Sequence, residues 1–146
     1  MENSLVYDDL KGFFKSRIRD DIQQTVIISD RFKEENTDKP LGFIIKGISE
    51  FENEELKAAS RRPFGKNSNE FRFDNKAYCN RLIVAATVYP NFKNVELQRN
   101  WGAFNAEELV CKMLLAGEYA KLLAAVKKLS GFDESIHDLK GTVKNS

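Results

Sequence analysis

The sequence predicts an α+β fold, in which a small antiparallel sheet is followed by a mainly helical C-terminal half. Two segments rich in β-branched residues, 25–29 and 41–48, flank a polar turn cluster and indicate a β-hairpin. Three apolar segments with helical spacing follow from residue 75 onward, and two of them begin after a residue type that caps helices.

The N-terminal segment, residues 4–19, places Phe13 and Phe14 among charged residues, which favours a short amphipathic helix. Gly12 weakens that helix by about 1 kcal/mol. We interpret residues 1–20 as an N-terminal arm, and Phe13 and Phe14 as candidate partner-binding residues.

Two predicted strands come next. Residues 25–29 (TVIIS) form the first and residues 41–48 (LGFIIKGI) the second. The polar cluster 36–40 supplies a turn between them, so the two strands are expected to pair as an antiparallel hairpin. Residues 70–73 (EFRF) indicate a short third strand.

A capped helix follows the hairpin. Ser49 and Glu52 match the capping box, in which the hydroxyl accepts from the third helical amide and the carboxylate reaches back to the cap. The helix is expected to end by Arg62, because Pro63 disfavours helical geometry in the residue before it. Residues 63–69 then form a loop.

The next helix, residues 75–89, is predicted to be the central buried helix. Asp74 caps its start, apolar side chains cover much of its circumference, and Pro90 ends it. Residues 94–100 predict one or two further helical turns that lead to Trp101. A tryptophan between turns typically fills a core, but Trp101 is also a candidate partner-binding residue.

Two helices complete the predicted fold. Asn105 caps a helix over residues 106–115, which Gly117 is expected to break. The last helix covers residues 118–129, and Gly131 suits the left-handed position that follows a helix end. The residues predicted to be almost fully buried are Leu82, Ala86, Leu109, Met113, Leu122 and Val126.

Length and composition predict one domain over residues 1–146, with a frayed tail at 142–146. The chain has 23 Lys and Arg against 22 Asp and Glu, so no global field draws it to nucleic acid or anionic lipid. The N-terminus lacks the pattern of a signal peptide, and the longest apolar run, 82–86, is too short to span a membrane.

The sequence contains no pattern that carries chemistry. His137 is the only histidine and is expected at the surface. Cys79 and Cys111 have no metal-ligand spacing and are predicted to be buried free thiols in a reducing cytoplasm. We therefore predict that the protein is not an enzyme and needs no metal or cofactor.

One basic run interleaves with aromatic residues: Arg61, Arg62, Lys66, Arg72, Lys76 and Arg81 alternate with Phe64, Phe71 and Phe73. This mixture is typical of surfaces that bind single-stranded nucleic acid. The competing interpretation is a solvated loop beside a strand whose aromatic side chains face inward, with the acidic helix before it balancing the charge. Nucleic-acid binding through residues 61–81 is the alternative function, and Arg61 and Arg62 are candidate partner-binding residues.

Several short motifs, in a fixed order and spacing, resemble the tail assembly chaperones of long-tailed bacteriophages and prophages, the XkdN-like group of Gram-positive hosts. The motifs are Arg31-Phe32-Lys33, Asn53-Glu54-Glu55-Leu56, Val88-Tyr89-Pro90, Asn94 to Gln98 (NVELQ), Gly102, Ala106-Glu107-Glu108-Leu109, Met113-Leu114-Leu115, Gly117-Glu118-Tyr119 and Gly131-Phe132. The resemblance covers residues 31–132, about 70% of the chain.

The resemblance implies a non-catalytic factor of the bacterial host cytoplasm that holds the tape measure protein until the tail tube polymerises around it. It leaves room for tail tube subunits as further partners and for self-association. It also implies that the protein is absent from the mature virion, and that the chain ending at Ser146 corresponds to the shorter of two frameshift-related forms.

The chemistry of this role is apolar burial. A long, helical, apolar partner needs a reversible apolar groove or arm that excludes water. The N-terminal segment with Phe13 and Phe14 and the helix 118–129 are the two candidate surfaces. The alternative remains a small phage or prophage protein that regulates or binds nucleic acid.

Overall fold

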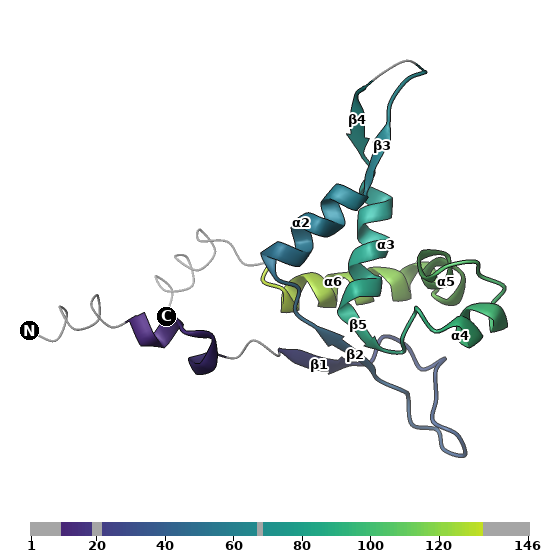
Figure 1. Cartoon of the computed structure of the whole chain (residues 1–146). Helices are drawn as coiled ribbons and strands as arrows, with labels where there is room; N and C mark the ends of the chain where they lie inside the picture. Colours follow the sequence, from purple (N-terminus) through teal and green to yellow (C-terminus); the bar gives the residue numbers. More distant parts are fainter. Residues whose placement is uncertain (1–9, 19–21, 67–68, 133–146) are drawn as a thin grey trace, which may run out of the picture.

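The computed structural model describes residues 10–18, 22–66 and 69–132. Its main core lies among four helices. The helices are α2 (Glu50–Ala59), α3 (Asn75–Ala86), α5 (Ala106–Met113) and α6 (Ala116–Leu129), with α3 in the centre (Figure 1). All six residues predicted to be buried are buried, including Leu82 and Leu122. The α+β fold and the central place of α3 are therefore confirmed. His137 and the tail 142–146 lie outside the described residues.

The predicted hairpin is confirmed, but its strand bounds differ: the first strand begins two residues earlier than predicted and excludes residues 27–29, and the second is shorter at both ends. β1 (Gln23–Val26) pairs antiparallel with β2 (Phe43–Lys46), in a register that places Thr25 opposite Ile44. The central strand β2 also pairs with β5 (Thr87–Tyr89), so the sheet has the order β1-β2-β5. β2 turns Phe43 and Ile45 into the core.

The structure corrects the end of the central helix. The prediction extended the helix to residue 89, but α3 stops at Ala86 and residues 87–89 form β5. Thr87 and Val88 are β-branched and Tyr89 is aromatic, so all three suit an extended strand. Ile44 of β2 pairs directly with Tyr89, which gives this segment a hydrogen-bonded partner that helical continuation would not provide.

The third predicted strand exists but belongs elsewhere. β4 (Phe71–Phe73) pairs with β3 (Arg61–Pro63), a strand the sequence analysis did not predict. The two form a separate antiparallel sheet that projects from the helical body (Figure 1). We call it the β3–β4 ribbon. Residues predicted as helix end and loop thus become one strand of a protruding arm.

Helix starts agree with the predicted caps. The side chains of Ser49, Asp74 and Asn105 each accept a hydrogen bond from the backbone N–H three residues later. Asn94 does the same for α4 (Val95–Asn100), which fits the predicted turns at 94–100. These contacts satisfy amides that a helix start leaves without a partner.

The prediction that Gly117 breaks a helix is wrong. The break comes earlier, where Leu114 and Leu115 are extended, and Gly117 lies in the first turn of α6. Glu118 accepts from the Leu115 N–H at 2.8 Å and so caps the new helix start. Gly131 behaves as predicted, with a φ of 85° just after α6.

Two further predictions need correction. The N-terminal segment contains two 3₁₀ helices, η1 (Leu10–Phe13) and η2 (Lys15–Arg17), in place of an amphipathic α-helix. None of their residues is buried, so no packing offsets the low helix propensity of Gly12. Of the two free cysteines, Cys79 is buried as predicted and Cys111 is exposed.

Candidate partner-binding site

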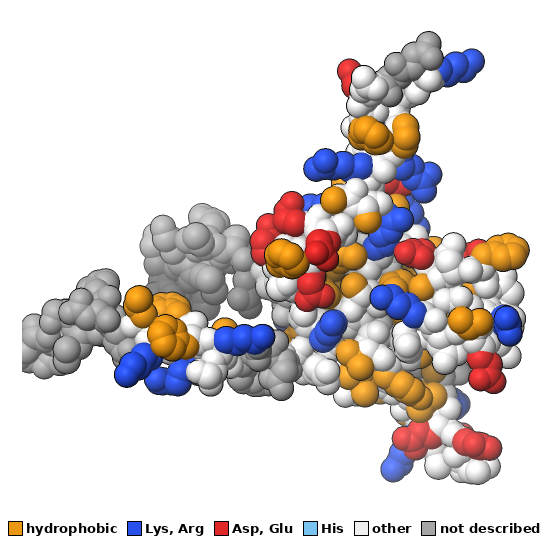
Figure 2. Space-filling model, in the orientation of Figure 1, with side chains coloured by type: hydrophobic (Ala, Val, Ile, Leu, Met, Phe, Trp, Pro, Cys, Tyr) orange, Lys and Arg blue, Asp and Glu red, His pale blue; other side chains and the backbone are white. Residues whose placement is uncertain are grey.

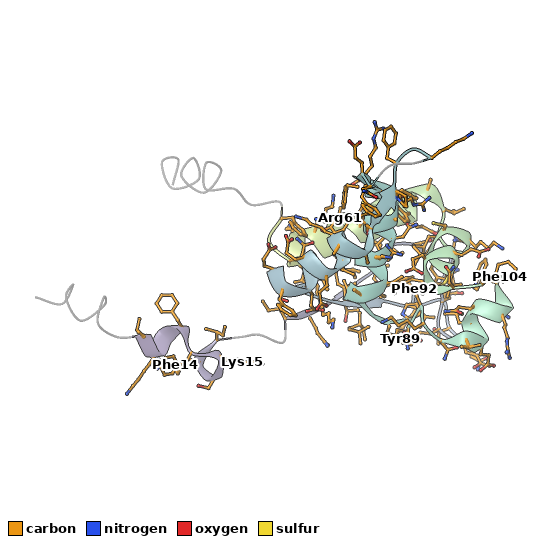
Figure 3. The ribbon with its side chains drawn as sticks, turned by 45° about the horizontal axis from the view of Figure 1, so that its top comes forward. Phe14, Lys15, Arg61, Tyr89, Phe92 and Phe104 are labelled. Carbon is orange, nitrogen blue, oxygen red and sulfur yellow. The ribbon has the colours of Figure 1, made fainter. Side chains whose placement is uncertain are left out.

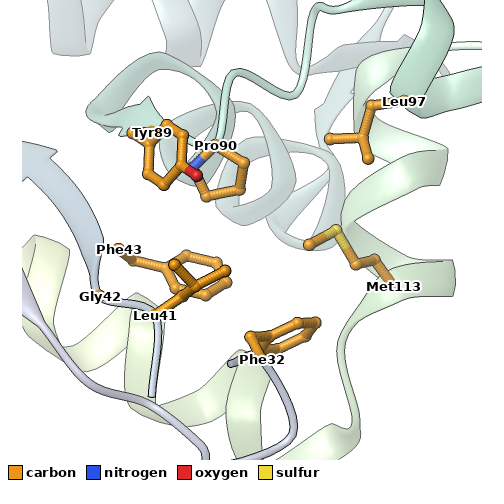
Figure 4. A pocket seen from close by; sticks show the side chains of 8 residues that line it. All are labelled: Phe32, Leu41, Gly42, Phe43, Tyr89, Pro90, Leu97 and Met113. Atoms are coloured by element: carbon orange, nitrogen blue, oxygen red, sulfur yellow. The ribbon is translucent and has the colours of Figure 1, made fainter. Parts of the chain in front are cut away.

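An apolar pocket opens on the surface where the sheet meets α4 and α5. Its volume is about 190 Å³. Figure 4 shows Leu41 and Phe43 on one side, Leu97 and Met113 on the other, and Phe32 facing Tyr89 across the opening. The complete lining is Phe32, Leu41, Gly42, Phe43, Tyr89, Pro90, Leu97 and Met113. The pocket offers mainly apolar surface for burial.

The loop between β1 and β2 builds one wall of this pocket. Its backbone folds back on itself, with the Leu41 N–H donating to the Phe32 carbonyl at 2.6 Å. The two side chains thereby line the same opening. The ring of Phe32 meets the ring of Phe43 edge to face, with centroids 5.5 Å apart, which fixes the loop against β2.

Arg31 ties this loop to the helices. Its Nε and Nη2 atoms donate to both carboxylate oxygens of Glu118, at 2.8 and 2.6 Å, and Nη2 also donates to the Met113 carbonyl at 2.9 Å. Glu118 is only 5% exposed. The bidentate hydrogen bonds from Arg31 lower the pKa of Glu118 to about 2, against the burial that would raise it. The carboxylate is therefore ionised at neutral pH and holds the Phe32 wall in place.

The ribbon carries Arg61 and Arg62, two of the residues predicted to bind a partner. Both are exposed, and Arg62 also pairs with Asp74 at its base, with Nε 2.5 Å from Oδ2. The interpretation that its aromatic side chains face inward is wrong, because Phe64 and Phe71 are exposed. No helix covers the ribbon in the described part of the chain (Figure 1).

The other predicted residues lie elsewhere. Phe13 is 80% exposed and Phe14 54%, both on the N-terminal arm. Trp101 is 36% exposed at the end of α4, so it is not the core residue that a tryptophan between turns suggests. Figure 3 places Phe14, Arg61 and Phe104 on three different parts of the molecule. Phe104 follows Trp101 by three positions in the sequence and so marks that region. The structure does not gather the predicted residues into one site.

The helix 118–129, the second predicted surface, is largely part of the core. α6 buries Glu118, Leu122 and Val126 against the rest of the body. The apolar side chains of α6 therefore pack against other parts of the same chain. Sequence reasoning missed the pocket instead, although Phe32, Tyr89 and Leu97 each lie in one of the short motifs described above.

The described residues lack two features. Within them, no three His, Cys, Asp or Glu side chains stand close enough together to hold a metal ion. No helix among residues 10–18, 22–66 and 69–132 is both long and apolar enough to cross a bilayer. The described surface includes an apolar pocket, exposed phenylalanines near the N-terminus and a basic ribbon.

Comparison with known proteins gives the family. The profile described as "Phage XkdN-like tail assembly chaperone protein, TAC" matches residues 10–144. This chain therefore belongs to the XkdN-like family of phage tail assembly chaperones.

Relatives match along nearly the whole chain. The uncharacterized protein YqbN of Bacillus subtilis strain 168 is 32% identical over 152 residues, which cover 99% of this chain and 97% of YqbN. The phage-like element PBSX protein XkdN of the same strain is 26% identical over 150 residues, covering 99% and 98%. A crystal structure of YqbN superposes with a TM-score of 0.72 at 28% identity, covering 85% of this chain and 97% of that one.

Proposed function

We propose that this chain binds the tape measure protein, and tail tube subunits as further partners, before the tail tube polymerises. It acts in the cytoplasm of the bacterial host, performs no catalysis and is absent from the mature virion. The family supports a role in tail assembly with phage tail proteins as partners. One hydrophobic cluster joins the sheet to the helices, which also supports our view of residues 1–146 as one domain.

The observation that carries this proposal is where the short motifs meet. Phe32, Tyr89-Pro90, Leu97 and Met113 come from four separate motifs and line the same pocket. Arg31 and Glu118, from two motifs 87 residues apart, hold the pocket wall. An apolar partner helix that inserts a side chain there would be bound by water exclusion and released without covalent chemistry. Reversible binding of this kind is what a chaperone needs.

The alternative function is weaker but has a specific observation behind it. Phe64 and Phe71 are exposed beside arginines on the ribbon, and proteins that bind single-stranded nucleic acid have surfaces of this kind. One of the arginines already has an acidic partner within the chain, because Arg62 pairs with Asp74. We therefore favour a protein partner.

Co-expression tests the proposal directly. We expect the cognate tape measure protein to be soluble when it is produced together with this chain, and insoluble alone. The two proteins should migrate as one complex on a sizing column, and the complex should survive moderate salt because apolar burial dominates it. Equal insolubility of the tape measure protein with and without this chain, and no recovered complex, would refute the proposed function.

The N-terminal arm makes a separate prediction. Phe13→Ala together with Phe14→Ala should weaken the complex with the tape measure protein and leave the thermal midpoint nearly unchanged, since both side chains are exposed. Calorimetry of the free chain and titration of the complex give the two readouts.

Tyr89→Ala is the comparison variant for the pocket, because it removes a half-exposed side chain that lines the pocket. If Tyr89→Ala weakens the complex and the double arm variant does not, the pocket carries the contact and the arm prediction is wrong.

A further inference from the structure

The β3–β4 ribbon has two different faces. Residues directly opposite each other in an antiparallel pair point to the same side of the sheet. Phe73 lies opposite Arg61 and Phe71 opposite Pro63, so one face carries two phenylalanines with Arg61 beside them. Arg72 lies opposite Arg62, so the other face is cationic.

The aromatic face is not explained by packing within the chain. Phe71 is 61% exposed, and Phe73 is 48% exposed although its ring contacts Tyr78 at a centroid distance of 5.5 Å. A monomeric protein gains nothing from projecting two neighbouring phenylalanines into water.

The cationic face is costly in the free chain. Like charges directly opposite each other destabilise a strand pair, and a two-stranded ribbon alone is marginally stable in water. Arg62 is balanced by Asp74 at 2.5 Å. Arg72 stacks on the ring of Phe64, with its guanidinium carbon 3.4 Å from the centroid, and no carboxylate of the described residues pairs with it. Arg61 lies on the face of Phe71 and Phe73, and the described residues contain no ion-pair partner for it.

The charge of the ribbon defines the chemistry of its partner. Residues 61–73 contain four Lys and Arg against one Glu, although the whole chain has a net charge of only +1. Figure 2 shows basic and apolar side chains together along the ribbon. Carboxylates placed among apolar residues would complement both faces at once.

Nearby carboxylates favour a protein over a nucleic acid. α2 ends at Ala59, one residue before β3, and it carries Glu54 and Glu55 about 7 Å along the helix axis from that end. Figure 2 shows acidic side chains gathered below the ribbon, over α2. A uniform polyanion that followed the ribbon to its base would meet these carboxylates, whereas a protein segment can be acidic over a short length only.

We propose that the β3–β4 ribbon is the docking arm for a short acidic, amphipathic segment of a phage tail protein, with Phe71 and Phe73 receiving its apolar side chains and Arg61 and Arg72 its carboxylates. This inference rests on the proposed function, since it takes a tail protein as the partner. It adds a second contact whose strength depends on salt, beside the apolar pocket and arm.

The experiment uses an array of 20-residue peptides that tile the cognate tape measure and tail tube proteins, probed with the full-length chain. The captured peptides should be those with net negative charge and interspersed apolar residues. Their affinity should fall at least tenfold in the double variant Arg61→Glu with Arg72→Glu, and also as salt rises from about 50 to 300 mM. Phe71→Ser should weaken the same peptides.

A matched control keeps the net charge equal. Lys121→Glu with Lys128→Glu changes two exposed cations of α6 and should leave peptide capture unchanged. Thermal unfolding of all variants verifies that the body is intact. Arg62 is left unchanged, because its partner Asp74 also caps α3.

Several results would overturn the inference. The first two are capture of peptides that show no acidic bias, and capture by the charge-reversed variant that equals capture by the wild type. The third is tighter binding of a 30-nucleotide oligo(dT) than of any peptide. The fourth is a charge reversal whose one effect, seen on a sizing column, is loss of self-association. Co-expression separates the two proposals. If the charge-reversed chain still keeps the tape measure protein soluble and the array shows no acidic preference, the ribbon inference fails while the chaperone function stands. If the wild type forms no complex with the tape measure protein or with tail tube subunits but still captures acidic peptides, the chaperone function fails while the ribbon inference stands.

Discussion

Glu118→Gln is expected to lower the free energy of unfolding by about 2 kcal/mol at pH 7. A pKa lowered from 4.5 to about 2 corresponds to roughly 3 kcal/mol of preference for the ionised form. The expected loss is smaller than this figure because the side chain of Arg31 is 38% exposed and partly screened by water. Glutamine keeps the shape of the site but leaves the Arg31 guanidinium without a carboxylate. Chemical denaturation of both proteins gives the difference.

The same pair predicts a pH dependence. Because the pKa of Glu118 is lower in the folded chain, its contribution to stability is fully present above the unfolded value of 4.5 and is lost as pH falls toward about 2. The difference in stability between wild type and Glu118→Gln should therefore shrink across this window. Glu54→Gln is the control, since Glu54 forms an exposed pair with Lys57 and should change stability little. A difference that stays constant from pH 7 to pH 2.5 would contradict this assignment.

Local chemistry explains what the sequence could predict. Ser49, Asp74 and Asn105 were recognisable as caps because the interaction joins a side chain to an amide three residues later. The buried face of α3 followed from the spacing of apolar residues. Neither signal depends on a distant part of the chain.

Non-local pairing explains what the sequence could not predict. Periodicity alone does not distinguish a short apolar strand from the end of a buried helix, and β5 became a strand because β2 offers it a partner. β3 is polar and contains Pro63, and it is a strand only through its pairing with residues 71–73. Both decisions depend on contacts that no local pattern contains.

The candidate site was hidden for the same reason. Phe32, Tyr89 and Met113 were each visible within a motif, but their meeting in one pocket requires the folded chain. The pair of Arg31 and Glu118 spans 87 residues and has no local signature. Motifs spread over the sequence suggested a family, and the structure brings five of the nine together to build and hold one apolar opening.

Leu82→Ala is expected to destabilise the protein by about 3 to 5 kcal/mol. Leu82 is completely buried in α3, the helix that contacts α2, α5, α6 and β5. Its removal loses apolar burial and leaves a cavity that four surrounding elements, held by their own packing, are poorly able to fill. For a chain of this size, a loss of that magnitude is a large share of the total stability.

Leu10→Ala is the matched control, because it makes the same chemical change at a side chain that is 64% exposed in η1. It should change stability by less than about 0.5 kcal/mol. Urea denaturation of the two variants beside the wild type measures both effects, and the difference between them isolates burial from residue type. Similar midpoints for Leu82→Ala and Leu10→Ala would mean that α3 is not the centre of the core. Because α3 leads directly into β5 and so to Tyr89 at the pocket, the loss of packing at Leu82 should also reduce recovery of the tape measure complex.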